Sequence, residues 1–376
     1  MVGNPITINI GNKFEVTTDF RTEGQDSLIF LRYYNSQLPE SSFLGYGWRS
    51  NFDRGFRYNA GSPSSSTIVW FTRPDGSTYS FTNTSGAWLA MDPDVNAQLV
   101  SLGSAGWVLT DQNDNVETYT QNGQLSSIKT RSGYQQNLTY DANGNLASVT
   151  DSFGRTLTFT IVNGTIHTMT DPDGNVYTYN YRNLLVTSDQ LVSVTFPGSD
   201  SPTVQYLYEN TAYPYALTGI IDENGNRYAT WSYDANLRAI SSTHAGGADA
   251  TTLIYSLSST GVVTVTTTNA LGKQFTYTLS LIAGAGKITR IAGAASAHTA
   301  ATTESFTYDS NGYVASHTDN NGNITQYVND ARGHVTSETD AYGTSLARTI
   351  TTSWDATYNV PTEKVQPGLT VTARAI

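Results

Sequence analysis

The sequence contains no cysteine in its 376 residues, and charged residues make up only 14% of it, below the roughly 25% that is usual for globular proteins. Without cysteine, the chain cannot form a disulfide framework or a thiolate metal site. It has no run of about 18 uninterrupted apolar residues, which predicts that no segment inserts into a membrane as a helix. The opening residues, MVGNPITINIGNKFEV, lack the basic region and the apolar core of a signal peptide.

Basic residues are also scarce, because 20 lysines and arginines oppose 31 aspartates and glutamates and leave a net charge of −11. Nucleic acids and anionic membranes are bound mainly through clusters of basic residues, and no such cluster occurs in the sequence. We therefore expect no nucleic-acid partner. The sequence also lacks a nucleophile elbow, a Walker loop and a dinucleotide fingerprint, which predicts that the chain is not an enzyme and holds no cofactor.

What the sequence has instead is 32 glycines, many of which recur at a fixed interval. Two interleaved series each advance by 20 or 21 residues: Gly123, Gly144 and Gly164 form one, and Gly133, Gly154 and Gly174 form the other. The pattern returns near the end of the chain in Gly312 and Gly333, offset from Gly322 and Gly343. A fixed interval of this length is typical of repeat proteins, in which each unit buries its apolar face against its neighbours.

The segments between these turns alternate polar and apolar residues, as in Thr156–Ile161, Val263–Thr267 and Phe275–Leu281. Strict alternation is typical of β-strands with one buried face. Asn-Gly and Asp-Gly dipeptides separate many of the segments, and they tolerate the positive φ angles of tight hairpin turns. The sequence therefore predicts a succession of antiparallel hairpins.

Two short motifs recur within the repeats. The first, Asp-x-x-Gly, occurs at Asp151 with Gly154, Asp171 with Gly174, Asp222 with Gly225, and Asp319 with Gly322. The second, YDxxGN, is complete at Tyr140, Asp141, Gly144 and Asn145 and relaxed at Tyr308, Asp309 and Gly312. We expect the aromatic residues to stack along one face of the sheet, and the aspartates to close the turns through bonds to the backbone.

The repeats are uneven, and the first hundred residues follow a different pattern. Residues 184–220 and 240–306 depart from the interval, and the Ala/Gly-rich stretch 282–301 is interpreted as a surface excursion or a short helix. We predict an all-β protein with a β-rich, cap-like domain at residues 1–110 and a curved or spiralling antiparallel sheet of repeats at residues 111–376.

The motifs resemble those of the Rhs/YD-repeat family, and the segments VGNPITINIGNKFEVTTDF, LIFLRYYNS and LGYGWRSNFDR resemble the N-terminal module that opens its bacterial members. Within these segments, the residues taken as characteristic of the module are Asn4, Pro5, Arg32, Tyr34, Asn35, Gly47 and Trp48. The resemblance implies a long spiralling β-sheet that winds into a hollow shell, as in bacterial polymorphic toxins, insecticidal toxin complexes and teneurins.

For this chain, the resemblance implies a non-catalytic, encapsulating shell segment of a toxin or secreted effector. The expected partners are the remainder of a longer Rhs chain, a toxin cargo or secretion machinery, and the expected location is outside the cell, at its surface or in a target cell. The family's C-terminal aspartate autoprotease segment is not found. The last repeat begins at Trp354 and is incomplete. We therefore expect either that the sequence is part of a longer chain whose next hairpin covers its final strand, or that a partner or a second copy pairs with this free edge.

The alternative is a surface protein that binds or degrades polysaccharide. Glycoside hydrolysis requires only two suitably placed carboxyl groups. Four tryptophans could stack on sugar rings or, instead, fill the core between sheet and cap: Trp70, Trp88, Trp107 and Trp231. The five histidines follow no metal-binding spacing, and Asp171–Asn175 lacks the closing acid of a calcium loop, so we expect no metal.

Overall fold

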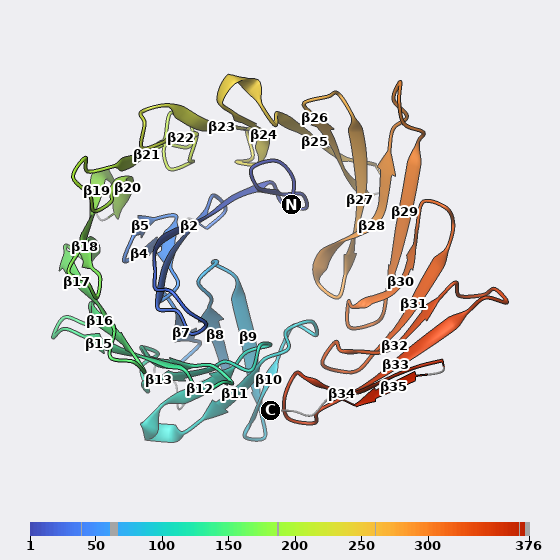
Figure 1. Ribbon diagram of the computed structural model, residues 1–376, viewed down its shortest axis with the longest axis horizontal. Helices are drawn as coiled ribbons and strands as arrows, with labels where there is room; N and C mark the ends of the chain where they lie inside the picture. The colour runs from blue at the N-terminus through green and yellow to red at the C-terminus, as the bar shows by residue number, and fades with distance from the viewer. Residues whose placement is uncertain (39, 61–66, 186–187, 260, 368, 373–376) are drawn as a thin grey trace. The chain divides into compact units, whose positions relative to one another are not determined.

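The computed structural model describes residues 1–376 except for 39, 61–66, 186–187, 260, 368 and 373–376 (Figure 1). Nearly every described element is a β-strand, and the described helices are two 3-10 turns, η2 (Gly103–Ala105) and η3 (Ala245–Gly247). Within this part of the chain, no helix is long and apolar enough to cross a membrane. The predicted all-β fold with a long antiparallel sheet is confirmed.

The chain folds into two compact units. The first unit contains Met1–Leu89, Leu99–Leu109 and Asn115–Thr252. The second contains Ala90–Gln98, Thr110–Asp114 and Leu253–Ile376. Each unit therefore combines segments from the first 114 residues with part of the repeats.

The first unit contains a small antiparallel sheet, here called the N-terminal sheet. Its strands are, in order, β1 (Ile6–Thr7), β2 (Asn12–Arg21), β3 (Ile29–Asn35) and β6 (Trp48–Ser50). Strand β3 alternates strictly, because Phe30, Arg32 and Tyr34 are buried while the residues between them are partly exposed. In Figure 1, β2 lies on the concave side of the repeat strands of the same unit.

Short strands connect the N-terminal sheet to the repeats. They are β4 (Ser41–Ser42), β5 (Gly45–Tyr46), β7 (Gly55–Tyr58), β8 (Ile68–Thr72), β9 (Thr78–Thr84), β10 (Ala87–Ala90), β11 (Gln98–Ser101) and β12 (Trp107–Thr110). Strands β7, β8 and β9 pair antiparallel in chain order.

The repeat sheet of the first unit pairs its strands antiparallel in chain order. These strands are β13 (Val116–Tyr119), β14 (Leu125–Lys129), β15 (Gln135–Tyr140), β16 (Leu146–Asp151), β17 (Thr156–Val162), β18 (Thr165–Thr170), β19 (Val176–Leu185), β20 (Ser188–Thr195), β21 (Thr203–Leu207), β22 (Gly219–Ile221), β23 (Arg227–Tyr233) and β24 (Ala239–His244). Strand β25 (Thr251–Leu257) pairs with β24 and continues into the second unit.

The recurring turns are built around aspartates. Asp141 Oδ1 accepts the backbone N–H groups of Asn143 and Asn145 at 2.8 and 2.9 Å, and Gly144 adopts a φ of +81°, which glycine tolerates best. The Asn145 amide donates to Asp141 Oδ2 at 2.9 Å. The same two backbone bonds recur at Asp151, Asp171, Asp222, Asp309 and Asp319. The glycines of these turns also have positive φ angles: Gly154, Gly174, Gly225, Gly312 and Gly322.

The residue before the turn aspartate ties its strand to the preceding repeat. The hydroxyls of Tyr140 and Tyr308 donate to backbone carbonyls 15 and 20 residues earlier, at 2.8 and 2.6 Å. Asn329 and Trp354 stand at the tyrosine position of later repeats, and their side-chain N–H groups donate to carbonyls 15 and 19 residues earlier. The tyrosine of the motif therefore acts as a donor between repeats, and other donors replace it.

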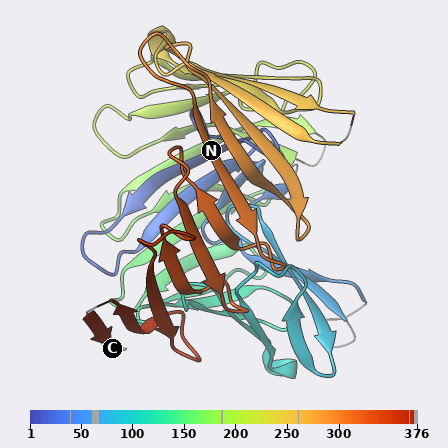
Figure 2. The same ribbon diagram turned by 90° about the vertical axis from the view of Figure 1, so that its right-hand side faces the viewer.

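The second unit continues the antiparallel pattern, and Figure 2 shows its strands side by side. They are β26 (Val263–Asn269), β27 (Gln274–Ile282), β28 (Ala285–Gly293), β29 (Thr302–Tyr308), β30 (Val314–Thr318), β31 (Ile324–Asn329), β32 (Val335–Asp340), β33 (Arg348–Trp354), β34 (Pro361–Gln366) and β35 (Leu369–Thr372). The segment Ala90–Gln98 packs against them, since Lys287 pairs with Asp94 at 2.7 Å and Tyr313 donates to the Pro93 carbonyl at 2.9 Å.

The interpretation of 282–301 as a surface excursion or a short helix is wrong for Ala285–Gly293. Residues Ala285–Gly293 form β28, which pairs with β27 on one side and with β29 on the other. Alanine and glycine have a weak preference for strands, but hydrogen bonding to two neighbouring strands overrides it. The turn between β27 and β28 places Ala283 at a φ of +48° and Gly284 at +81°.

Candidate functional site

Many fully buried side chains of the first unit lie where the N-terminal sheet meets the repeat sheet, and we take this contact as the candidate functional site. At its centre, the Arg32 guanidinium donates to both carboxylate oxygens of Asp19, at 2.6 and 2.8 Å, and both side chains are fully buried. The Tyr179 hydroxyl, from repeat strand β19, donates to the same carboxylate at 2.8 Å. The Tyr179 hydrogen bond therefore connects this ion pair to a strand 160 residues further along the chain.

Aromatic rings surround this ion pair. Arg32 lies over the rings of Trp48, Tyr206 and Tyr179 at 5.1, 5.3 and 6.0 Å. Burial alone disfavours the charged guanidinium, but Asp19 outweighs that effect and raises the pKa of Arg32 well above its usual value. Burial also raises the pKa of Tyr179 well above its usual value, so this hydroxyl remains a donor.

Trp48 and Tyr34 connect the N-terminal sheet to repeat strands further along the chain. The Trp48 indole N–H donates to the Tyr208 hydroxyl at 2.8 Å, and its ring lies 4.7 Å from that of Tyr206. The Tyr34 hydroxyl accepts the Leu217 N–H at 2.8 Å and donates to the backbone carbonyl of residue 215 at 3.1 Å. Both side chains are fully buried, so each carries a polar contact through an otherwise apolar layer.

Lys13 forms a second buried polar centre. Its ammonium donates to the Asn4 carbonyl at 2.9 Å, pairs with Glu15 at 2.5 Å and lies 4.0 Å from the ring centre of Trp231. The Trp231 indole N–H donates to the same Asn4 carbonyl at 2.7 Å. Burial lowers the pKa of Lys13 to about 8, and Glu15 offsets only part of that effect.

Glu117 forms a third buried centre, on strand β13. Arg73 donates to both of its carboxylate oxygens at 2.6 Å, and Arg54 and the Tyr119 hydroxyl bind it as well. Burial alone would raise the pKa of Glu117, but Arg54 and Arg73 outweigh that effect and hold it at about 2. The carboxylate therefore stays ionised and joins β13 to the short strands of the same unit.

The other residues predicted for the N-terminal module have structural contacts. The Pro5 carbonyl accepts the Phe14 N–H at 3.2 Å, and Asn35 donates from its amide to the backbone carbonyl of residue 75 at 3.2 Å. Gly47 has a φ of +77°, and a Cβ atom there would lie 3.2 Å from the Tyr34 ring. The structure thus brings Asn4, Arg32, Tyr34 and Trp48 onto the repeat sheet, whereas Asn35 lies at the edge of the contact.

The four tryptophans considered for sugar stacking fall into two groups. Trp107 and Trp231 are 2% exposed, so their rings belong to the interior. Trp70 and Trp88 are half-buried; Arg57 covers the Trp70 ring at 4.9 Å, and Trp88 lies edge-on to Trp107 at 5.1 Å. The structure does not bring the four rings together on one surface.

Within the described residues, no group of three or more histidine, aspartate or glutamate side chains is placed to hold a metal ion. The Asp171 carboxylate accepts N–H groups from Asp173 and Asn175 within its own turn.

Sequence reasoning missed Lys13, Asp19 and Glu117. Each looks like an ordinary strand charge in the sequence, and each becomes buried only because distant strands pack over it. A partial signal was present: in the segment LIFLRYYNS, Arg32 stands in phase with Phe30 and Tyr34, at a position where alternation predicts an inward side chain. A buried arginine requires an acidic partner, but the sequence does not say which one.

Comparisons with known proteins bear on this arrangement. The family model of the RHS Repeat matches residues 119–160, and the model of the Domain of unknown function (DUF6531) matches residues 3–81. No curated protein matches the chain.

Solved structures similar to the chain include those described as TcdB2-TccC3-TEV and TcdB2-TccC3 without hypervariable C-terminal region, each at 13% identity. The first match covers 90% of this chain and 18% of the solved chain, with a TM-score of 0.39; the second covers 94% and 22%, with a TM-score of 0.40. A Photorhabdus luminescens Tc holotoxin pore is 11% identical, with 96% and 20% coverage and a TM-score of 0.30.

The chain therefore spans about a fifth of the length of these solved chains. The family match at 119–160 falls on β14, β15, β16 and most of β17, where the aspartate turns and the tyrosine donors between repeats are regular. The predicted resemblance to Rhs/YD repeats is therefore confirmed by the RHS Repeat match over residues 119–160.

Proposed function

We propose that this chain is a non-catalytic shell segment of an Rhs-type toxin or secreted effector, in which the N-terminal sheet fixes the first repeats. The observation that carries the proposal is the buried Arg32–Asp19 pair with its Tyr179 bond. A buried ion pair adds little net stability but is strongly penalised when its partner moves away. Such a contact favours one rigid arrangement of the two sheets, as the wall of a shell requires.

The partners of a shell segment follow from its role. We propose that this chain associates with the remainder of a longer Rhs chain, and through it with a toxin cargo or secretion machinery. The match of the RHS Repeat model at residues 119–160 supports that reading. The corresponding location is that of a bacterial effector that is secreted, displayed or delivered.

We also propose a functional boundary near residue 110, with a cap-like domain at 1–110 and the repeats at 111–376. The sequence supports it, because the 20- to 21-residue interval of the glycines begins after this point. In this scheme, residues 1–110 supply the layer that covers the first repeats, and the repeats supply the wall.

The shell proposal is tested by co-expressing the chain with the continuation of the longer chain that carries the cargo. We expect the two polypeptides to elute together as one particle, and added protease to spare the cargo portion. Matched samples with Asp19→Leu should lose this protection, while Glu209→Leu, which breaks an exposed ion pair, should retain it.

The polysaccharide alternative is tested on the chain alone. A shell segment should give no signal on a glycan array and release no reducing sugar from polysaccharide. Sustained turnover, or cargo that is digested as fast in the particle as when free, would contradict the proposal.

A further inference from the structure

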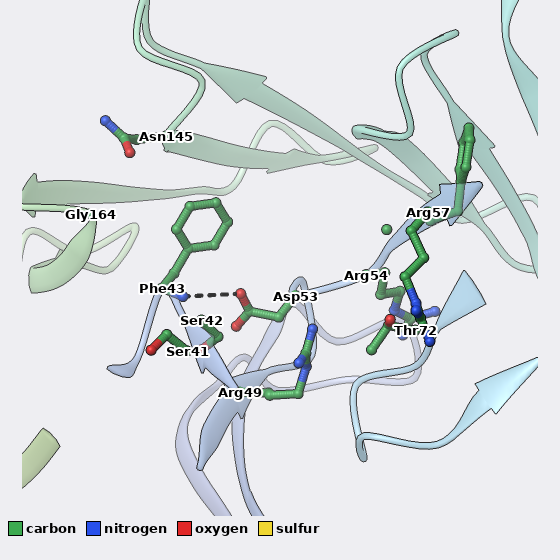
Figure 3. A pocket seen from close by; sticks show the side chains of 12 residues that line it. Ser41, Ser42, Phe43, Arg49, Asp53, Arg54, Arg57, Thr72, Asn145 and Gly164 are labelled. Carbon is green, nitrogen blue, oxygen red and sulfur yellow. Dashed lines mark hydrogen bonds between the residues drawn. The ribbon is translucent and has the colours of Figure 1, made fainter. Parts of the chain in front are cut away.

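A cavity of about 510 Å³ lies in the first unit, between the short strands near the N-terminal sheet and the turns at Asn145 and Gly164 (Figure 3). The residues that matter most in its lining are Phe43, Arg49, Asp53, Arg54, Phe56 and Arg57. Cavities of this size accommodate small organic ligands.

The charged lining is mainly basic, although the chain as a whole has a net charge of −11. Three arginines line the cavity with a single carboxylate, that of Asp53. The Arg54 partner, Glu117, is shared with Arg73, so the two guanidiniums exceed their carboxylate by one charge. With these partners included, the four arginines in and beside the lining exceed the three carboxylates, Asp53, Glu40 and Glu117, by one charge.

Two of the arginines have donors to spare. Arg49 meets the Glu40 carboxylate at 3.5 Å, but Glu40 is 58% exposed, and the buried Nε of Arg49 has no hydrogen-bond partner. Arg57 is exposed and held by its stacking on the Trp70 ring at 4.9 Å. No described carboxylate pairs with Arg57. A guanidinium presents several N–H donors in a planar fork that matches carboxylate and phosphate oxygens.

The Asp53 carboxylate interacts with the charge of Arg49 and is held by backbone donors. Its carboxylate accepts the Ser50 N–H at 2.5 Å and the Phe43 N–H at 3.3 Å, the second of which is drawn in Figure 3. These bonds fix it to the turn that carries Arg49 and Arg54. Burial raises the pKa of Asp53 above its usual value.

We propose that this cavity binds a small, multiply charged oxyanion ligand, with Arg49 and Arg57 holding its charged groups and Phe43 and Phe56 contacting its less polar part. The ligand chemistry is that of a phosphate ester or a polycarboxylate. Both present clustered anionic oxygens, which guanidinium groups bind through charge-assisted hydrogen bonds. This activity goes beyond the shell function and would give the N-terminal region a ligand of its own.

The test is calorimetric titration of the full chain with pyrophosphate, inorganic phosphate and citrate at matched ionic strength. We expect saturable binding of at least one of them and a higher thermal midpoint in its presence. Arg57→Gln should weaken binding by about tenfold or more without changing the midpoint of the unliganded protein, since one charge-assisted contact is worth roughly that factor. Arg49→Gln is the second variant and should weaken the binding of the same anion.

The control is Arg21→Gln, which removes an equal charge from the exposed end of β2. It should bind as the unmodified chain does. Preference for pyrophosphate or phosphate over citrate identifies a phosphate ligand, and the reverse preference identifies a polycarboxylate. Absence of binding by all three anions, or equal weakening by Arg57→Gln and Arg21→Gln, would overturn the proposal.

Discussion

The two units use the same hairpins but bury their aromatic residues to different degrees. In the first unit, Tyr179, Tyr206 and Trp231 are 0%, 3% and 2% exposed. In the second unit, every residue of β29–β34 lies in the part of the chain that the structure describes, and none of them is fully buried. Phe306 and Trp354 there remain half-exposed.

The comparison shows that the YD repeat alone does not determine how deeply its aromatic residues are buried. The aspartate turns and the donors between repeats are equally regular in both units, so they do not determine burial. In the first unit, rings of the N-terminal sheet cover the repeat aromatics, as Phe30 covers Tyr179 and Trp48 covers Tyr206. A second layer therefore completes the core, and each buried aromatic ring contributes at about 25 cal/mol per Å² of apolar surface.

The largest expected loss of stability follows from removing the buried charge of the first unit. Arg32→Met leaves the Asp19 carboxylate buried without its partner, which should cost about 3–5 kcal/mol in the free energy of unfolding. Arg227→Met removes a pair with Glu209 whose side chains are 38% and 54% exposed, and it should cost less than about 1 kcal/mol. Urea denaturation measures both. Equal losses would show that the contact between the two sheets is not the stabilising feature of this unit.

The next effect compares two tryptophans with similar local partners. Trp231 donates to a carbonyl and lies beside Lys13, and Trp354 donates to a carbonyl and stacks on His334 at 4.3 Å. Trp231 is 2% exposed, whereas Trp354 is only half-buried. Trp231→Ala should therefore cost about 3–5 kcal/mol, whereas Trp354→Ala should cost roughly half as much or less. The comparison fails if the Trp354 variant is the less stable of the two in denaturant.

Lys13 predicts a pH dependence that belongs to the first unit. Its pKa in the folded chain is about 8, against a usual value of 10.5, so between these values the unfolded chain holds a proton that the folded chain has released. Below pH 8, the folded chain bears the full free-energy cost of burying the Lys13 charge. This cost decreases as the pH rises towards 10 and the folded chain releases the proton. Stability should therefore increase over this window, by up to about 3 kcal/mol.

The control for this pH dependence is Lys13→Met. Urea denaturation at a series of pH values should show no increase in the stability of this variant between pH 8 and 10. A variant that keeps the full increase would assign the effect to another group.

The smallest effect concerns the turns that both units share. Gly144→Val should destabilise the chain by about 1 kcal/mol or more, because a β-branched residue is strained at a φ of +81°. The strain is in the backbone alone, since the only atom within 4 Å of an added Cβ is Gln124 Nε2, at 3.8 Å. Gly322→Val should have the same effect in the second unit, where nothing lies within 4 Å. An unchanged melting temperature in both variants would show that the positive φ angle at these turns does not limit the stability of the chain.

The turns were predictable because their chemistry is local. Asp141, Gly144 and Asn145 lie within five consecutive positions, and their bonds involve the same turn. The aspartate turn also forms without glycine. In the turn at Asp234, Leu237 takes the glycine position with a φ of +60°, and the aspartate still accepts both backbone N–H groups. Sequence patterns of this kind specify strands and turns reliably.

The second layer was not predictable from the same patterns. Asp19 and Lys13 are buried by repeat strands more than a hundred residues away, and a single sequence does not show which strands meet. Arg32 and Trp48 entered the prediction only through a family resemblance, without their partners Asp19 and Tyr208. The strand at Ala285–Gly293 was missed for a related reason, because its neighbours rather than its composition specify it.

Hydrogen exchange on the complete chain, with and without Trp48→Ala, tests most directly whether the N-terminal sheet stabilises the repeats that it covers. The account predicts slow exchange in β19–β21, close to the rate of unfolding of the whole unit, and faster exchange in β31–β33 through local opening. Trp48→Ala should accelerate exchange in β19–β21 and leave β31–β33 unchanged. Equal protection of the two groups of strands, or a variant that leaves β19–β21 as slow as before, would contradict the account.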